Sequence, residues 1–201
     1  MRVSLPDRPG ALGLVAGAVG AAGADIVSVE VVARGDGEVI DDFVVTLPPD
    51  AYPDTIVSAC QQLAGVQVVW ISRYPEGGGL QSDIEALELM SHDPENAAET
   101  LASQSVQVFH VHWAMVVRPE PEPAVTFATP QAPPLGSALL RTLEPWGEVH
   151  SQEVQLPDWG GQIVAIAPLR DGRVVVIGRQ GGPPFLASEL ARFGHLAALA
   201  R

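Results

Sequence analysis

The sequence predicts an α+β protein of two units, and three observations lead to this fold class. In residues 1–74 the apolar pattern gives the order strand, helix, strand, strand, helix, strand. A glycine-rich break follows at 75–79. After the break, helical and alternating patterns resume toward the C-terminus. We therefore expect a first domain over 1–74, a linker over 75–81 and a second domain over 82–201.

The first strand, residues 2–6, runs into the turn Asp7-Arg8-Pro9-Gly10-Ala11-Leu12 and then into a helix. Asp7 is suited to cap the first amides of this helix, and Gly10 allows close approach to the backbone. The amides that remain exposed lie at the positive end of the helix, where a carboxylate or another small anion is favoured. By itself, such a turn more often only starts a helix.

The helix after this turn is expected to end at Gly23, and its glycines predict close packing. Its predicted buried face consists of Leu12, Val15, Ala16 and Val19.

The rest of the first domain follows the same logic. Strands over 25–32 and 39–47 form a hairpin around the turn at 34–38, a second helix begins near Asp54, and a last strand covers 66–73. This order is that of the ferredoxin-like βαββαβ fold, a four-stranded antiparallel sheet with two helices on one face.

The turn at 7–12, the later Gly23-Ala24-Asp25-Ile26 and this strand order resemble the ACT domain, a family of small-molecule-sensing modules that most often bind amino acids. In that family the Asp-x-Pro-Gly-x-Leu loop holds the ligand's amino and carboxyl groups. The family often has Asn where this chain has Asp25, and a carboxylate there would attract an ammonium group. The resemblance implies these ligand-binding residues: Asp7, Arg8, Pro9, Gly10, Ala11, Leu12, Asp25 and Ile26.

The resemblance also implies a homodimer, because ACT domains commonly join edge strands into a longer sheet with the ligand in the seam. The expected partners are a second copy of the chain and an amino acid or similar small zwitterion. A Rossmann dinucleotide site is excluded, since the glycines from Gly10 to Gly13 do not form Gly-x-Gly-x-x-Gly and the second strand turns back as a hairpin.

The second domain is expected to hold helices from about Ser82 and Asp93, strands over 106–117 and 124–128, a hairpin over 162–179 and a final helix from about Phe185. Several short motifs follow in this part of the chain: Ala167-Pro168-Leu169, a valine strand ending at Gly178-Arg179, and the later Pro184-Phe185 and Glu189-Leu190. Together they resemble a GAF domain over roughly 82–200. The predicted fold of this part is an antiparallel sheet flanked by helices. Trp146 and Trp159 fit core packing better than the lining of a ligand pocket.

GAF domains can hold cyclic nucleotides, haem or bilins. The one cysteine, Cys60, lies in the first domain, so it offers no bilin thioether here, and nothing singles out His150 or His195 as a haem ligand. The chain also contains no lysine, which excludes Schiff-base chemistry, pyridoxal phosphate attachment and the Walker-type phosphate loop. We expect no cofactor.

The composition is that of an acidic globular protein. Of 201 residues, 47% are hydrophobic and 17% are charged, which is enough apolar material for a core. The net charge is −13, and both halves are acidic, so we expect no nucleic-acid partner. One cysteine permits no intramolecular disulfide, and no apolar run approaches the ~20 residues that span a bilayer. With no secretory signal pattern either, we expect a cytoplasmic protein without a membrane partner.

The pattern contains no catalytic constellation. Asp41 and Asp42 point to opposite faces of one strand, and no nucleophile elbow is present. His110 and His112 share a face of a predicted strand, but two histidines without a further ligand are more typical of a half-exposed sheet than of a metal site. We expect a non-enzymatic amino-acid sensor. Two alternatives stay open: a dimerisation scaffold without a ligand, and an enzyme with a site between the two domains.

Overall fold

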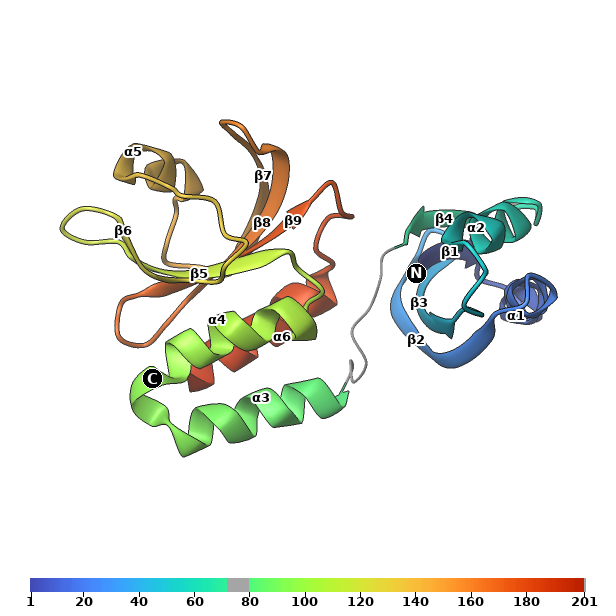
Figure 1. The fold of residues 1–201 in the computed structure, drawn as a ribbon, viewed down its shortest axis with the longest axis horizontal. Coiled ribbons are helices and arrows are strands. Elements are labelled where there is room, and N and C mark those ends of the chain that lie inside the picture. The colour runs from blue at the N-terminus through green and yellow to red at the C-terminus, as the bar shows by residue number, and fades with distance from the viewer. Residues whose placement is uncertain (72–79, 201) are drawn as a thin grey trace. The chain divides into compact units, whose positions relative to one another are not determined.

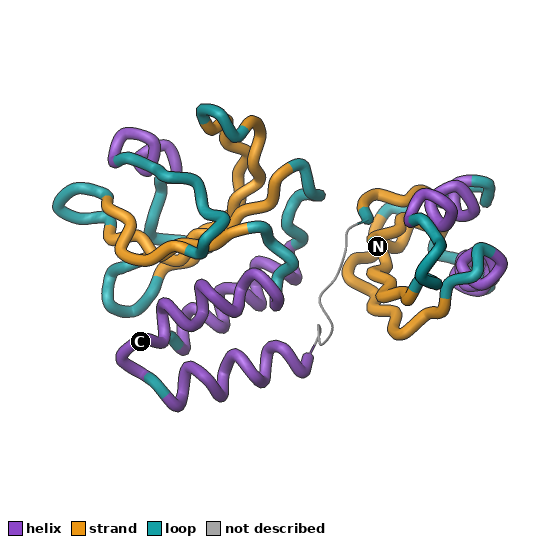
Figure 2. Tube along the Cα trace, viewed as in Figure 1, coloured by secondary structure: helices purple, strands orange, loops and turns teal. Residues whose placement is uncertain are grey.

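The structure, a computed structural model, describes residues 1–71 and 80–200. Contacts divide the chain into two units, Met1–Tyr74 and Pro75–Arg201. In chain order the helices and strands are β1 Arg2–Pro6, α1 Ala11–Ala21, β2 Asp25–Gly35, β3 Glu38–Thr46, α2 Pro53–Gln61, β4 Gln67–Trp70, α3 Leu80–His92, α4 Ala97–Val108, β5 Trp113–Arg118, β6 Ala124–Ala128, α5 Ser137–Leu140, β7 His150–Leu156, β8 Gly160–Pro168, β9 Val174–Gln180 and α6 Ala187–Leu199, with short 3-10 helices at Pro94–Asn96 and Arg141–Leu143 (Figures 1 and 2).

The N-terminal unit has the predicted βαββαβ order and a four-stranded sheet in the order β2-β3-β1-β4. All neighbouring strands are antiparallel. The fold class expected for this unit is therefore confirmed. Residues 72–79, which hold the end of the predicted fourth strand and most of the predicted linker, lie outside the described residues.

One face of this sheet packs against α1 and α2. The core joins Val3, Leu5 and Phe43 of the sheet to Val15 of α1 and Ile56 of α2. Burial of such side chains stabilises the unit by about 1.5–3 kcal/mol each.

The packing of α1 differs from the prediction in two respects. Its buried residues are Ala11, Val15 and Val19, whereas Leu12 is 42% exposed. Three of its glycines also lack the expected close packing, because an added Cβ would meet nothing within 4 Å at Gly13, Gly17 or Gly20. The reason is that glycine carries no side chain, so its periodicity does not show which way it faces.

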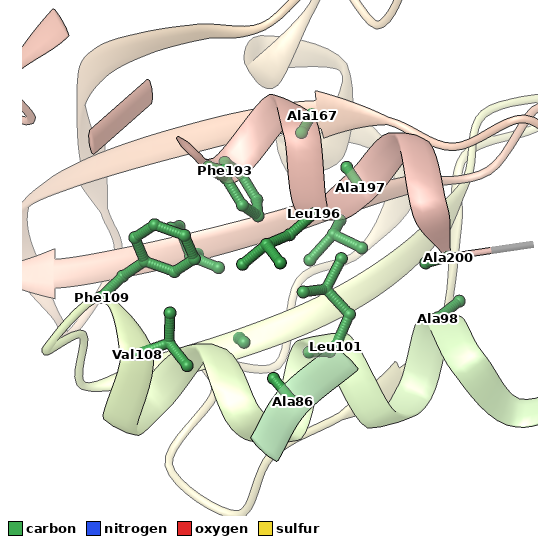
Figure 3. Close-up of a cluster of buried hydrophobic side chains, with 14 of the residues drawn as sticks. Ala86, Ala98, Leu101, Val108, Phe109, Ala167, Phe193, Leu196, Ala197 and Ala200 are labelled. Carbon is green, nitrogen blue, oxygen red and sulfur yellow. The ribbon is translucent and has the colours of Figure 1, made fainter. Parts of the chain in front are cut away.

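The second unit is built on a five-stranded antiparallel sheet in the order β6-β5-β9-β8-β7. Helices α4 and α6 lie against one face of the sheet, and α3 packs on α4 (Figure 1). Figure 3 shows the core that results, in which Leu101 of α4 meets Leu196 and Ala197 of α6. The rings of Phe109 and Phe193 lie edge to face with centroids 5.2 Å apart. The predicted antiparallel sheet flanked by helices is thus confirmed.

One predicted element of this unit is wrong, the strand over 106–117. Residues 106–108 end helix α4, and the strand begins only at Trp113. Between them His110 takes a left-handed backbone with φ 51°, so the alternating pattern of 106–117 runs through a turn. Helix α3 begins at Leu80, near its predicted start at about Ser82.

The opposite face of the second sheet carries its own apolar core. Trp113, which is 1% exposed, lies at the centre of this core, and Trp146 and Trp159 pack around it. This packing is the role that the sequence favours for the two partly buried tryptophans. No helix in the described ranges is both long and apolar enough to cross a membrane.

Candidate functional site

The turn after β1 is held by backbone hydrogen bonds. The N–H of Asp7 donates to the carbonyl oxygen of Gly37 at 2.9 Å, which ties the turn to the tip of the β2–β3 hairpin. Gly10 takes the N-cap position of α1 with φ 88°, a conformation that favours glycine. The predicted cap by Asp7 is wrong, because no side chain donates or accepts at this cap.

The start of α1 nevertheless presents free backbone donors. The N–H of Ala11 donates to Arg8 O at 3.2 Å, and that of Leu14 donates to Gly10 O at 3.1 Å. Among the described residues, no acceptor takes the intervening N–H groups of Leu12 and Gly13. Both residues are exposed, so these donors face solvent at the positive end of the helix.

One cation lies beside the turn. Arg34 Nη1 is 4.0 Å from Asp7 Oδ1, and both side chains are largely exposed. Water screens such a pair, so it contributes at most about 1 kcal/mol. Arg34 is therefore free to exchange Asp7 for another anion at little cost.

Asp41 of β3 is a buried carboxyl group on the helix-covered face of the same sheet. It is 2% exposed, and its Oδ1 has no hydrogen-bond partner among the described residues. Burial raises the pKa of Asp41; the Arg34 guanidinium opposes this rise, while Asp42 and Asp7 add to it. A buried carboxyl oxygen without a partner is unfavourable, so this feature needs an explanation.

The sequence contained a signal for Asp41 that the site prediction did not use. Asp41 falls between Val39 and Phe43 in the inward row of β3, where apolar residues are expected. An acid in such a row indicates a buried charge. Asp42 faces the other side, where Arg2 binds it through two hydrogen bonds of 2.9 and 2.7 Å, as the alternation of the strand requires.

The predicted site residues fall into two groups. Asp7 to Leu12 lie at the N-terminal end of α1, and Asp25 and Ile26 follow its C-terminal end. The 11 residues of α1 make a helix of about 16 Å, so one chain does not bring the two groups together. Ala11 and Ile26 are also part of the core cluster, which leaves their backbone as the part available to a ligand.

Strand β2 is an edge of the sheet and is unusually apolar for its exposure. It pairs with β3 along one side only in the described part of the chain. Val27, Val29 and Val31 are 64%, 38% and 47% exposed. A long edge strand with exposed valines is a surface typical of pairing with another strand.

A surface groove also runs between the helices of this unit, at the end of α1 opposite to the turn. Its lining comes from the second half of α1 and from α2, with Asp54 as its charged residue. None of the predicted ligand residues lines it. The groove is therefore separate from the predicted site.

In the second unit the histidines do not form a metal pair. His110 lies in the turn, and His112 Nδ1 accepts a hydrogen bond from the Gln180 N–H at 3.1 Å. Across 1–71 and 80–200, no group of three or more metal-ligating side chains is present.

The charged side chains that are most deeply buried here form a structural pair. Arg179, 2% exposed, binds Glu189 of α6 and donates to the carbonyl oxygen of Phe109 at 2.7 Å. Its guanidinium also lies 4.1 Å from the ring centroid of Phe185. The pair fastens the start of α6 to the end of α4.

No family model and no curated protein sequence matches this chain. Among solved structures, the chain is similar to a GAF domain from Pseudomonas syringae pv. tomato. The two share 12% sequence identity with a TM-score of 0.40, over 60% of this chain and 81% of that domain.

Proposed function

We propose that this chain is a non-enzymatic sensor whose ACT-like N-terminal unit binds an amino acid or a similar small zwitterion. The observation that carries the proposal is the pair of free N–H groups at Leu12 and Gly13, which the left-handed Gly10 leaves open at the start of α1. Backbone donors at a helix N-terminus favour a carboxylate. Arg34, screened and loosely paired, adds a second anion-binding group beside them.

A second copy would complete this site through β2. Two β2 strands can pair antiparallel with Glu30 of one chain opposite Glu30 of the other. Residue 25 of one chain then lies opposite residue 35 of the other. Asp25 of the partner subunit then lies beside Gly35, close to Arg34 and the turn. This pairing unites the two groups of predicted residues that one chain keeps apart, and it covers the exposed valines of β2.

The second unit, GAF-like in the predicted order of its elements, is the proposed responder. Coupling requires that the ligand bind more tightly in one state of the protein than in another. The response would then depend on how occupancy of the dimer seam changes the packing of the second units.

The test is a thermal-shift and calorimetric screen of the full chain against the twenty amino acids. A ligand at 100 times its Kd stabilises the folded state by about 2.7 kcal/mol, which raises the melting temperature by several degrees. Gly13→Val should abolish this response, because its Cβ points toward the helix N-terminus and the methyl groups cover the free amides. Gly17→Val is the matched control, since it lies one turn further along the same exposed, uncrowded face.

A response from no amino acid, or an equal response from both valine variants, would refute the sensor. Sedimentation analysis then tests the second candidate, a scaffold that only dimerises, which the exposed valines of β2 favour. Val29→Lys should convert a β2-paired dimer to a monomer, because the variant buries a charge in the seam.

A further inference from the structure

We propose that Asp41 binds the ammonium group of the ligand, and that the ligand is an amino acid with an apolar side chain. This inference rests on the proposed function and specifies the chemistry of the same site.

Asp41 is the exception among the buried polar groups of its unit. On the other face, Arg2 binds Asp42, and Ser4 Oγ donates to Glu38 Oε2 at 2.7 Å. Asp41 Oδ1 is the sole buried side-chain nitrogen or oxygen without a partner in the described part of the N-terminal unit. Its two acidic neighbours, Asp7 and Asp42, make its ionisation less favourable still. A ligand that supplies both a positive charge and hydrogen-bond donors would compensate for this burial.

The position of Asp41 connects it to the turn. Asp41 is opposite Val31 of β2 and Val3 of β1, and it lies two residues from Val39, whose β2 partner is Arg34. Two residues of strand span about 7 Å. The charges that act on Asp41 include Arg34 and Asp7, which meet at the turn. A ligand whose ammonium group binds Asp41 would therefore place its carboxylate toward Arg34 and the free amides of α1.

The surface beside Asp41 is apolar. Cross-strand pairs place Val31 next to Asp41 and Val29 next to Phe43, all on the face that α1 covers in part. Val31 is 47% exposed in the single chain, so the carboxyl group lies beside the edge at which the proposed seam forms. A ligand side chain that enters the seam beside this face contacts the methyl groups of Val29 and Val31, which favours an aliphatic or aromatic side chain over a polar one.

The test compares matched probes by calorimetry on the full chain. The amino-acid probes are L-valine, L-leucine and L-phenylalanine. The probes without the ammonium group are 3-methylbutanoate, 4-methylpentanoate and 3-phenylpropionate. Asp41→Asn should weaken binding of the amino acid that binds wild type by at least about tenfold, because it removes the charge that the ammonium group pairs with. The same variant should not weaken binding of the corresponding carboxylate, because that probe has no ammonium group for Asp41 to pair with.

Asp36→Asn is the control for net charge, because Asp36 is exposed at the hairpin tip with φ 55°, a backbone that Asn tolerates. It should bind like wild type. Asp41→Val, which continues the apolar row of β3, is the second variant and should lose the amino acid in the same way. The unfolding midpoint of both Asp41 variants without ligand should equal or exceed that of wild type, since each removes a buried uncompensated carboxyl group.

The outcomes separate the two proposals. If wild type binds an apolar amino acid and Asp41→Asn binds it equally well, the role of Asp41 is refuted and the sensor stands. If only polar amino acids bind, the apolar class is refuted. If no amino acid binds wild type, the sensor itself fails and the role of Asp41 fails with it.

Discussion

The contact between Gly178 and Trp113 should make Gly178→Ala one of the most destabilising small substitutions in the second unit. The two residues are cross-strand partners in β9 and β5, and Trp113 is 1% exposed. A Cβ at position 178 would lie 2.1 Å from Trp113 Cε2 and 2.6 Å from its Nε1. An ordinary carbon–carbon contact is about 3.5 Å, so the indole has to move by roughly 1 Å or more.

That movement has two energetic consequences. Overpacking in a filled core costs about 1–3 kcal/mol. The displaced indole also loses its hydrogen bond, in which Nε1 donates to Gln162 Oε1 at 3.0 Å, and both groups are buried. An unpaired buried polar group costs about 1–3 kcal/mol more. We therefore expect Gly178→Ala to lower the free energy of unfolding of the second unit by about 2–6 kcal/mol.

Urea unfolding of the full chain, followed by near-UV circular dichroism of tryptophan, measures this change. Gly147→Ala is the matched control in the same unit, because a Cβ there would meet nothing within 4 Å and its φ is not positive. The control should change stability by no more than about 0.5 kcal/mol. Equal midpoints for the two variants would refute the reasoning and show that the core around Trp113 accommodates an added methyl group.

Three further predictions follow from buried groups and backbone geometry. Glu189→Ala should destabilise the second unit by about 3–5 kcal/mol by leaving the buried Arg179 without its counter-charge; urea unfolding measures this, and a loss below 1 kcal/mol would contradict it. Burial raises the pKa of Asp41 in the folded state. Below about pH 4 the folded and the unfolded protein therefore both hold the proton of Asp41, and above that pH the unfolded protein loses it first. Wild type should thus lose stability relative to Asp41→Asn as the pH rises from about 4 through the raised pKa; a pH-independent difference in unfolding free energy would contradict this. Gly10→Val should abolish any ligand response and also cost about 1–2 kcal/mol, because the left-handed φ of 88° strains a branched residue; retained binding at wild-type affinity would place the site elsewhere.

Much of the fold could be predicted because its determinants are local. The alternation of β3, the glycine that precedes α1 and the turn at 34–38 each specify backbone conformation within a few residues. The failures occur where local patterns are ambiguous. Residues 106–117 alternate like one strand, but tertiary packing ends α4 at Val108 and turns the chain at His110.

The sequence by itself determined the order of elements, the α+β class and the exposed amides at the start of the first helix, because strand and helix periodicities and turn residues act over short distances. Only the tertiary structure decided which groups meet. It separated Asp25 from Gly10 by the length of α1, and it placed Asp41 beneath the surface with no partner for its Oδ1 in the described part of the chain. Burial and partnering depend on residues far apart in the chain, and periodicity alone does not determine them.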